Sequence, residues 1–406
     1  MAAAFLWDLI QYQRLLLMML VLGIGGSLQL GFQGSMIPFT SLHVKTFIND
    51  TWLERSGHPV HPETLTLLWS LIVSIFGLGG LLGSMASGHL TAKYGKKRCL
   101  LGNNVLMLAS AFLVGFSKVA KSFELILAGR FLCGISTAMK TLWGEGSHQA
   151  ELEDLRKEQA AIQSSRSKSV LELLKEPSLR WQLYVLVLLV VSGQLSGIQA
   201  IYFYMFEVLH TAGLDNNEIP YLSLGVSLSE LFSALLCSFL IERAGRRVLL
   251  WGGYGLMATV LAAITLTFSL QPWFSWMPYC SLTLIFCLVI FFGMGPAGAT
   301  ASVRMEIFDQ SSRSSAFVIS SVLNWVGVFV IGMAFPFIVE SLRQFSFLVF
   351  MGVLYMAGFL TYFFLPETKE KSILEIREEF DKLNFKKKPL VLETSHIEGR
   401  TFCTKL

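Results

Sequence analysis

Long apolar runs alternate with short polar segments along most of this chain. A helix that crosses the hydrocarbon core of a bilayer needs about 20 apolar residues. The first run has no small-residue cleavage site after it, so it is interpreted as a retained span and not as a signal peptide. Ten runs of sufficient length predict membrane-spanning helices at residues 15–37, 66–88, 99–117, 122–140, 181–204, 220–241, 248–270, 276–302, 316–340 and 345–365.

The composition supports an integral membrane protein. Hydrophobic residues make up 53% of the chain and charged residues only 15%, whereas a soluble domain carries about 25% charged residues. The net charge of +4 comes from short basic stretches and not from a general basic surface, which excludes a nucleic-acid partner. The cysteines lack a paired spacing, so neither a disulfide framework nor a metal site is expected. They are Cys99, Cys133, Cys237, Cys280, Cys287 and Cys403.

The distribution of Lys and Arg predicts the orientation in the membrane. With the N-terminus in the cytosol, only five cations lie outside, at Lys45, Arg55, Lys118, Lys121 and Arg343. Such a bias is typical of cytosolic loops. The predicted outer loop, residues 38–65, then contains the glycosylation acceptor at residues 49–51, which requires the lumenal side. We therefore expect both termini in the cytosol and a glycan on Asn49.

Two short inner loops resemble each other. Residues 93–98 (KYGKKR) follow the second span and residues 243–247 (RAGRR) follow the sixth. Positive-inside bias alone would explain either loop singly, but the same glycine-plus-cation pattern at equivalent places favours two homologous halves. The first half has four spans and the second has six, and a charged segment, 147–180, separates them. The simplest explanation is that two spans are missing from the first half.

Five motifs together resemble the facilitative hexose transporters, the sugar-porter branch of the major facilitator superfamily. They lie at residues 88–98, 129–134, 194–197, 242–247 and 366–369. Residues 189–193 lack a further Gln-Leu-Ser of the glucose-preferring class, and Ala301 stands where that class has Trp, so the chain is similar to the class II, fructose-type branch.

The resemblance implies an all-α integral membrane protein of the major facilitator fold, with about ten of the family's twelve spans. Two helices would be deleted from the N-terminal bundle near Lys140 and Thr141. The expected organisation is an incomplete N-terminal bundle of four spans at 1–140, a cytosolic helical linker at 141–180, a C-terminal six-helix bundle at 181–365 and a cytosolic tail at 366–406. The resemblance also places the protein in the plasma membrane.

Five residues are candidates for contact with substrate. Sugar hydroxyls require side chains that both donate and accept hydrogen bonds over an aromatic face. Gln194, Gln199, Asn324 and Trp325 supply such groups within spans, and the family match favours Gln194, Asn324 and Trp325 as sugar contacts. From spacing alone the amides could equally join helices. Glu230 is an acid inside a span, which is functional by default; it could instead pair with a polar neighbour.

Three further sets of residues are candidates for moving parts. Gly295 and Pro296 interrupt a span, because Pro lacks an amide donor; a hinge and a purely structural kink are both compatible with this. Phe203 and Tyr204 resemble an outer gate or pack as bulky aromatics. Arg130 is expected to form a structural pair within its span, and it is also a candidate member of a cytosolic latch. The expected cytosolic latch comprises Gly95, Lys96, Arg98, Arg130, Glu242, Arg246, Arg247, Glu306 and Arg313.

The sequence therefore predicts a transporter and not an enzyme. The expected activity is facilitative transport of a hexose, fructose or glucose or both, by alternating access. We expect no cofactor, a hexose and the lipid bilayer as partners, and allow for a homo-oligomer. The alternative is a truncated, transport-inactive family member, because cavity-facing polar groups would meet hydrocarbon at several kcal/mol each.

Overall fold

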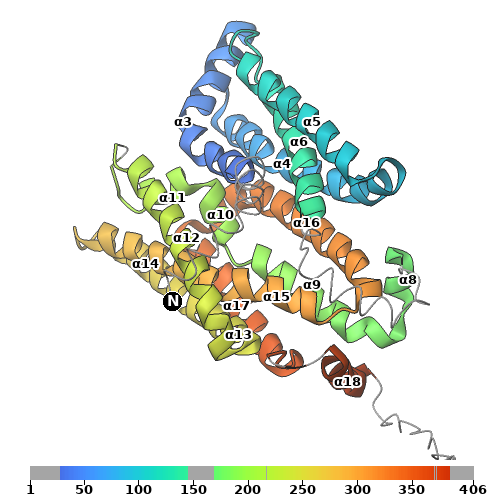
Figure 1. The fold of residues 1–406 in the computed structure, drawn as a ribbon. Helices are drawn as coiled ribbons and strands as arrows, with labels where there is room; N and C mark the ends of the chain where they lie inside the picture. The colour runs from blue at the N-terminus through green and yellow to red at the C-terminus, as the bar shows by residue number, and fades with distance from the viewer. Residues whose placement is uncertain (1–27, 145–168, 216, 370, 372, 385–406) are drawn as a thin grey trace, which may run out of the picture.

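The chain folds as an assembly of helices (Figure 1). The computed structural model describes residues 28–144 and 169–384, except 216, 370 and 372, and every regular element in that part of the chain is helical. Residues 1–27 and 145–168 lie outside the described residues, and with them most of the first predicted span and of the predicted linker. The tail beyond residue 384 lies outside them too.

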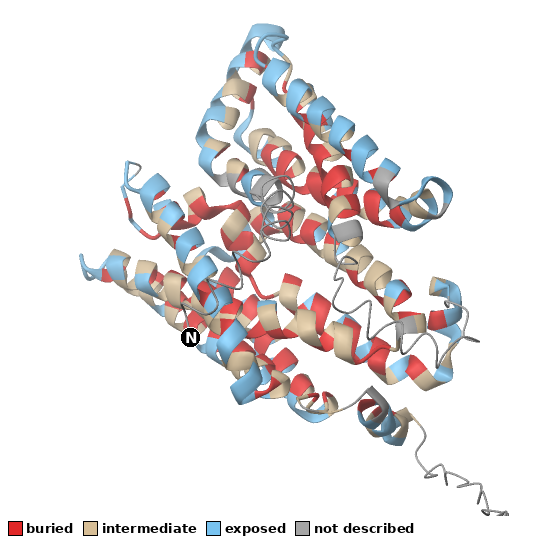
Figure 2. Cartoon of the chain, in the orientation of Figure 1, coloured by how far each residue is buried: buried red, intermediate tan, exposed pale blue. Residues whose placement is uncertain are grey.

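The first group contains α3 (Leu28–Ser56), α4 (Pro62–Tyr94), α5 (Lys96–Phe116) and α6 (Glu124–Gly144). Helix α6 packs along both α4 and α5, and the four lie together at the top of Figure 1. The outward face of α5 is largely exposed (Figure 2). An apolar helix with this exposure is suited to hydrocarbon as its solvent.

The prediction of an outer loop at 38–65 is wrong for most of these residues, because α3 remains helical to Ser56. Within this stretch Ile48 is fully buried, and Val44, Phe47 and Trp52 pack partly buried against the core. Their spacing of three or four residues is that of one helix face. The many polar residues of this segment lower its mean hydropathy, so the segment was not recognised as a helix with one apolar face.

The second group follows residue 169 and is joined by short turns. Helix α13 packs against α14 and α17, and α16 lies against α9. Its elements are α8 (Val170–Lys175), η2 (Pro177–Leu179), α9 (Arg180–Gln194), α10 (Ile198–Phe203), α11 (Met205–Thr211), α12 (Ile219–Ala244), α13 (Arg246–Leu270), α14 (Met277–Phe292), η3 (Gly293–Ala297), α15 (Gly298–Glu306), α16 (Gln310–Leu342), η4 (Arg343–Phe345), α17 (Ser346–Phe364) and α18 (Ile373–Asn384).

The described residues contain eight stretches long and apolar enough to cross a membrane. One of these, Ser311–Phe364, includes both α16 and α17 and so corresponds to two predicted spans. The nine predicted spans from 66–88 onward all coincide with helices. The total of ten stays a prediction, since most of the first predicted span, 15–37, lies outside the described residues.

The two groups meet where α16 packs along α4. The orange ribbon of α16 crosses against the first group in Figure 1. Buried side chains concentrate along α4, α6 and α16 near this crossing, as Figure 2 shows. The candidate site lies at this contact and along the adjoining helix α9.

Candidate functional site

Helix α9 stops in the middle of its span, as the glycines at 193 and 197 predict. The helix ends at Gln194, and α10 starts at Ile198 after Gly197, whose φ of 83° is left-handed. A left-handed residue is easiest for glycine, which has no Cβ. The hydroxyl of Ser196 donates to the Gly193 carbonyl at 2.7 Å and satisfies one of the backbone groups that the break releases. The break therefore places Gln194 at a helix end inside the protein.

Two predicted substrate residues meet at this helix end. Gln194 is 7% exposed, and its Nε2 donates to Oδ1 of Asn324 on α16 at 2.7 Å. Gln194 Oε1 is buried without a hydrogen-bond partner among the described residues. A buried acceptor without a donor costs about 1–3 kcal/mol. This oxygen is therefore a ready acceptor for a hydroxyl donor.

The indole of Trp325 fills the contact between α16 and α4. It is 7% exposed and lies edge-on to Phe76, with 5.3 Å between ring centroids. A Cβ built on Gly80 would overlap the Trp325 ring, so only glycine leaves room for it. One helical turn away, Ser84 Oγ lies 2.7 Å from Ser321 Oγ. The predicted pocket residue is thus also the main contact between the two groups of helices.

Gln199 lies near the start of the short helix α10, and Glu230 lies in the middle of α12. Gln199 is half-buried on α10, and Glu230 is half-buried on α12. The Glu230 carboxyl neighbours the Tyr202 hydroxyl, which is buried without a hydrogen-bond partner among the described residues. The Tyr202 hydroxyl is thus a polar neighbour of Glu230, as the alternative interpretation of this acid expects.

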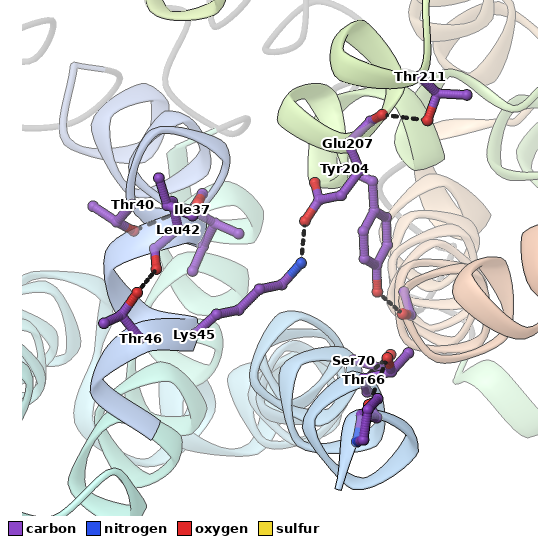
Figure 3. Close-up of polar contacts among 12 residues, drawn as sticks. Ile37, Thr40, Leu42, Lys45, Thr46, Thr66, Ser70, Tyr204, Glu207 and Thr211 are labelled. Carbon is purple, nitrogen blue, oxygen red and sulfur yellow. Dashed lines mark hydrogen bonds and ion pairs between the residues drawn. The ribbon is translucent and has the colours of Figure 1, made fainter. Parts of the chain in front are cut away.

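The predicted outer gate packs against α16. Tyr204 is 3% exposed, its hydroxyl donates to the Gly332 carbonyl at 2.6 Å, and its ring centroid lies 5.3 Å from that of Phe335. Phe203 is buried beside it. Figure 3 shows the Tyr204 side chain pointing from the light-green helices toward α16 and toward Ser70 of α4.

The predicted hinge coincides with a change in helix type. Gly295 and Pro296 belong to η3, a π-helical segment between α14 and α15. Single π-helical turns inside α-helices are frequent at functional sites. Both residues are buried, and η3 packs against α12 and α13.

An ion pair that the sequence did not predict joins the two groups at the ends predicted to lie on the outer side (Figure 3). Lys45 Nζ of α3 lies 2.5 Å from Glu207 Oε1 of α11, with the side chains 29% and 31% exposed. A groove of about 340 Å³ lies beside the pair and is lined also by Phe206 and His210. The sequence shows only that these two residues have opposite charges and lie on the same predicted side of the membrane. It does not indicate how far apart they are in space.

The predicted latch residues of the second group converge on two carboxylates. Arg246 Nη2 lies 3.0 Å from Glu306 Oε1. The backbone N–H groups of Arg246 and Arg247 donate to Glu367 at 2.9 and 3.1 Å. Arg247 also donates to the Tyr362 carbonyl. Glu367 had no assigned role in the sequence, although it stands in the motif at 366–369.

Other predicted latch residues lie outside this cluster. Arg98 and Glu242 are exposed, and Gly95 has a φ of 78°. The Nε of Arg313 donates at 3.4 Å to the carbonyl of Phe308, in the turn just before α16. The side chain of Lys96 lies outside the described residues.

Arg130 lies away from this cluster: the residue is 2% exposed, its Nε donates to Ile72 O at 3.4 Å, and its guanidinium lies over Phe76 at 4.7 Å. These contacts within a span agree with the expected structural pair, and the latch role stays a prediction.

The predicted glycosylation acceptor lies inside a helix. Asn49 is half-buried in α3, its Oδ1 accepts from Val60 N at 3.2 Å, and Thr51 is 4% exposed. The glycan therefore stays a prediction.

The chain resembles known sugar transporters in sequence. It matches the family described as "Sugar (and other) transporter" over residues 18–143 and 136–380. It is 33% identical to human solute carrier family 2, facilitated glucose transporter member 11, over 93% of this chain and 95% of that protein. It is 30% identical to rat member 5 over 89% of this chain and 90% of that protein.

The alignment with human member 11 is longer than the aligned part of this chain. It extends over 470 positions, whereas 93% of 406 residues is about 378, so about 90 positions have no residue here. The two family matches meet at 136–143, beside the junction that the resemblance implies. The resemblance at Glu230 predicts a likeness to member 11, and the identity over most of both chains confirms that likeness.

Solved structures show the fold. A D-xylose-proton symporter matches with a TM-score of 0.67 at 16% identity, over 84% of this chain and 96% of that one. This likeness confirms the all-α major facilitator architecture. The relatives are membrane transporters and not enzymes. From its family matches over most of its length, the chain belongs to the sugar (and other) transporter family.

Proposed function

We propose that this protein carries out facilitated diffusion of a hexose, fructose or glucose or both, by alternating access. The observation that carries the proposal is the site formed by Gln194, Asn324 and Trp325 at the contact of the two helix groups. It offers a paired set of amides, one unpartnered buried acceptor and an indole face, without a charge. An uncharged site of this kind suits a neutral polyol that must both enter and leave.

The geometry supplies elements that alternating access requires. On the outer side Lys45 pairs with Glu207, and Tyr204 donates to the carbonyl of Gly332. We propose that these contacts close the outer path and that breaking them opens it. The π-helical turn around Pro296 lies between the second-group helices and would absorb the bending.

We propose the membrane arrangement from the cation bias: both termini in the cytosol, in a plasma-membrane protein. The proposed units are those expected from the sequence, 1–140, 141–180, 181–365 and 366–406. Hexose and bilayer lipid are the proposed partners. A self-assembled oligomer is compatible with this arrangement.

A transport-inactive product is the second candidate, and one observation favours it. It is not the low burial of helices, since 17% of the span is buried both for α12 of the second group and for α5 of the first group. The alignment positions without a residue in this chain agree with the loss of two helices that would otherwise neighbour this group. Such a loss would remove the first group's share of a sugar cavity.

Uptake of labelled fructose and glucose, measured with surface biotinylation in the same cells, tests the proposal. We expect Gln194→Ala and Trp325→Ala to reduce uptake at least ten-fold at unchanged surface level, since both alter the site directly. Gln182→Ala is the matched control, because Gln182 is an equally buried amide of α9 whose polar neighbour is Asn384 near the other helix end.

Surface-expressed wild-type chain without uptake would overturn transport and leave the inactive product. Uptake that survives both site variants would remove these residues from the site while transport stands.

A further inference from the structure

A groove of about 440 Å³ lies at the start of α13, between α13 and the end of α17. Its walls include Arg247, Val248 and Trp251 from α13, Tyr362 from α17, and Lys369 from the segment after α17. The sugar site does not use these side chains. They combine two cations with two aromatic rings in one concave surface.

The groove is cationic although Glu367 belongs to its wall. The Glu367 carboxylate accepts from four backbone N–H groups, those of Arg246, Arg247, Thr368 and Lys369, at 2.9–3.1 Å. These donors hold it against the loop, so it is already satisfied by the backbone. Arg247 and Lys369 add two positive charges, and exposed Arg243 lies next to them, with its carbonyl accepting from Lys369 Nζ at 3.3 Å.

Arg247 is held in place and still has donor capacity. Its guanidinium lies 5.0 Å from the Tyr362 ring centroid, and one of its nitrogens donates to the Tyr362 carbonyl. Its Nε has no acceptor among the described residues. A planar guanidinium fixed over an aromatic ring is well suited to phosphate oxygens.

The aromatic wall continues into an exposed apolar surface on a membrane-spanning candidate, α17. Trp251 and Tyr362 are 40% and 47% exposed and lie edge to face at 5.7 Å. Exposed Phe359 and Phe363 extend this apolar surface along α17. Both helices are membrane-spanning candidates that end at the groove, and Trp and Tyr at such ends belong to the interfacial belt.

We propose that this groove binds one anionic membrane phospholipid. Its phosphate would contact Arg247 and Lys369, and an acyl chain would lie along Trp251, Tyr362 and the exposed face of α17. Basic pockets between spans at the cytosolic boundary recognise such headgroups. The continuity of cations with a hydrocarbon-facing surface favours a lipid over a soluble phosphate, which would use the cations alone. The proposal does not depend on which solute is transported.

Native mass spectrometry of the full purified chain, titrated with phosphatidylglycerol, tests this site. We expect one retained lipid per chain, and weak retention of zwitterionic phosphatidylcholine. Each cation near the membrane surface contributes about 1 kcal/mol, a factor of about five in affinity. Lys369→Gln should therefore weaken binding about five-fold, and the double variant Arg247→Gln/Lys369→Gln about 25-fold.

Lys118→Gln is the matched control, since it removes one exposed cation at the opposite, predicted outer end of the spans. It should leave lipid binding unchanged. Size-exclusion profiles and thermal unfolding identify any variant that fails to fold, and the single Lys369→Gln change outside the helices keeps the test available in that case. Glycerol 3-phosphate serves as a soluble competitor.

Unaltered phosphatidylglycerol binding in folded Lys369→Gln and in the double variant would overturn the site. Equal retention of phosphatidylcholine would overturn its preference for anionic lipid. Full displacement by glycerol 3-phosphate at the lipid's own concentration would show a soluble phosphate site instead. Persistence of the lipid against that competitor, with loss in the double variant, would support the proposal.

Discussion

Two predicted inner loops share a backbone conformation but differ in the described residues that surround them. Gly95 connects α4 to α5 with φ 78° and ψ 152°, and Gly245 connects α12 to α13 with φ 86° and ψ 160°. This region of conformational space is essentially restricted to glycine. Each glycine is followed at once by the first residue of the next helix. The repeated sequence pattern therefore corresponds to a repeated turn.

The neighbours of the two turns are different. A Cβ on Gly245 would lie 2.7 Å from Glu367 Oε2, whereas a Cβ on Gly95 would meet nothing within 4 Å. The N-terminus of α13 is capped by that carboxylate, and Arg246 pairs with Glu306. In the first group Arg98 is exposed. The local sequence sets the turn, but its stabilising partners come from distant segments.

Removing the carboxylate that caps α13 should have the largest effect on this difference. Glu367→Ala leaves four backbone donors without their acceptor, at a cost of about 3 kcal/mol after partial solvation. Thermal unfolding of the purified chain should show a clear loss of stability. Glu367→Gln keeps one carbonyl acceptor and should recover part of it. Equal stability of wild type and Glu367→Ala would mean that the cap contributes nothing.

The matched substitutions Gly245→Ala and Gly95→Ala should separate backbone strain from packing. Both place a Cβ at a positive φ, which costs about 1–3 kcal/mol. Only Gly245→Ala also displaces Glu367, so we expect its loss of stability to be about twice as large. Thermal unfolding of the two variants side by side measures the difference. Equal losses would show that the surroundings of the two turns are energetically equivalent.

Most of the helical framework could be predicted because apolar runs of membrane length are a strong signal. A weakened helix near Gln194 followed from its flanking glycines, although a full break did not. The helical end of α3 did not, since its polar residues obscure the buried face that includes Ile48. Hydropathy averaged over a window reports how apolar a segment is and loses the side on which its apolar residues lie.

The candidate site was predictable in its residues but less in its contacts. Gln194, Asn324 and Trp325 were recognised through the family motifs, and the structure brings Gln194 to Asn324. Lys45 and Glu207 lie 162 residues apart and belong to no motif. Their pairing depends on how closely α3 approaches α11. The residues around either position give no information about that distance.

The smallest effects should come from the cations that follow the two turns. In Arg246→Gln the half-buried Glu306 carboxylate loses its ion pair, with side chains 19% and 26% exposed. Because solvent screens this pair in part, we expect a loss of about 1 kcal/mol. Arg98→Gln removes the same charge from an exposed position and should change stability by less than about 0.5 kcal/mol. Thermal unfolding in low and high salt compares them, and salt should reduce the Arg246 effect. Two equal losses that salt reduces to the same extent would mean that the first turn has an acidic partner of its own, and that the two halves differ less than their described surroundings indicate.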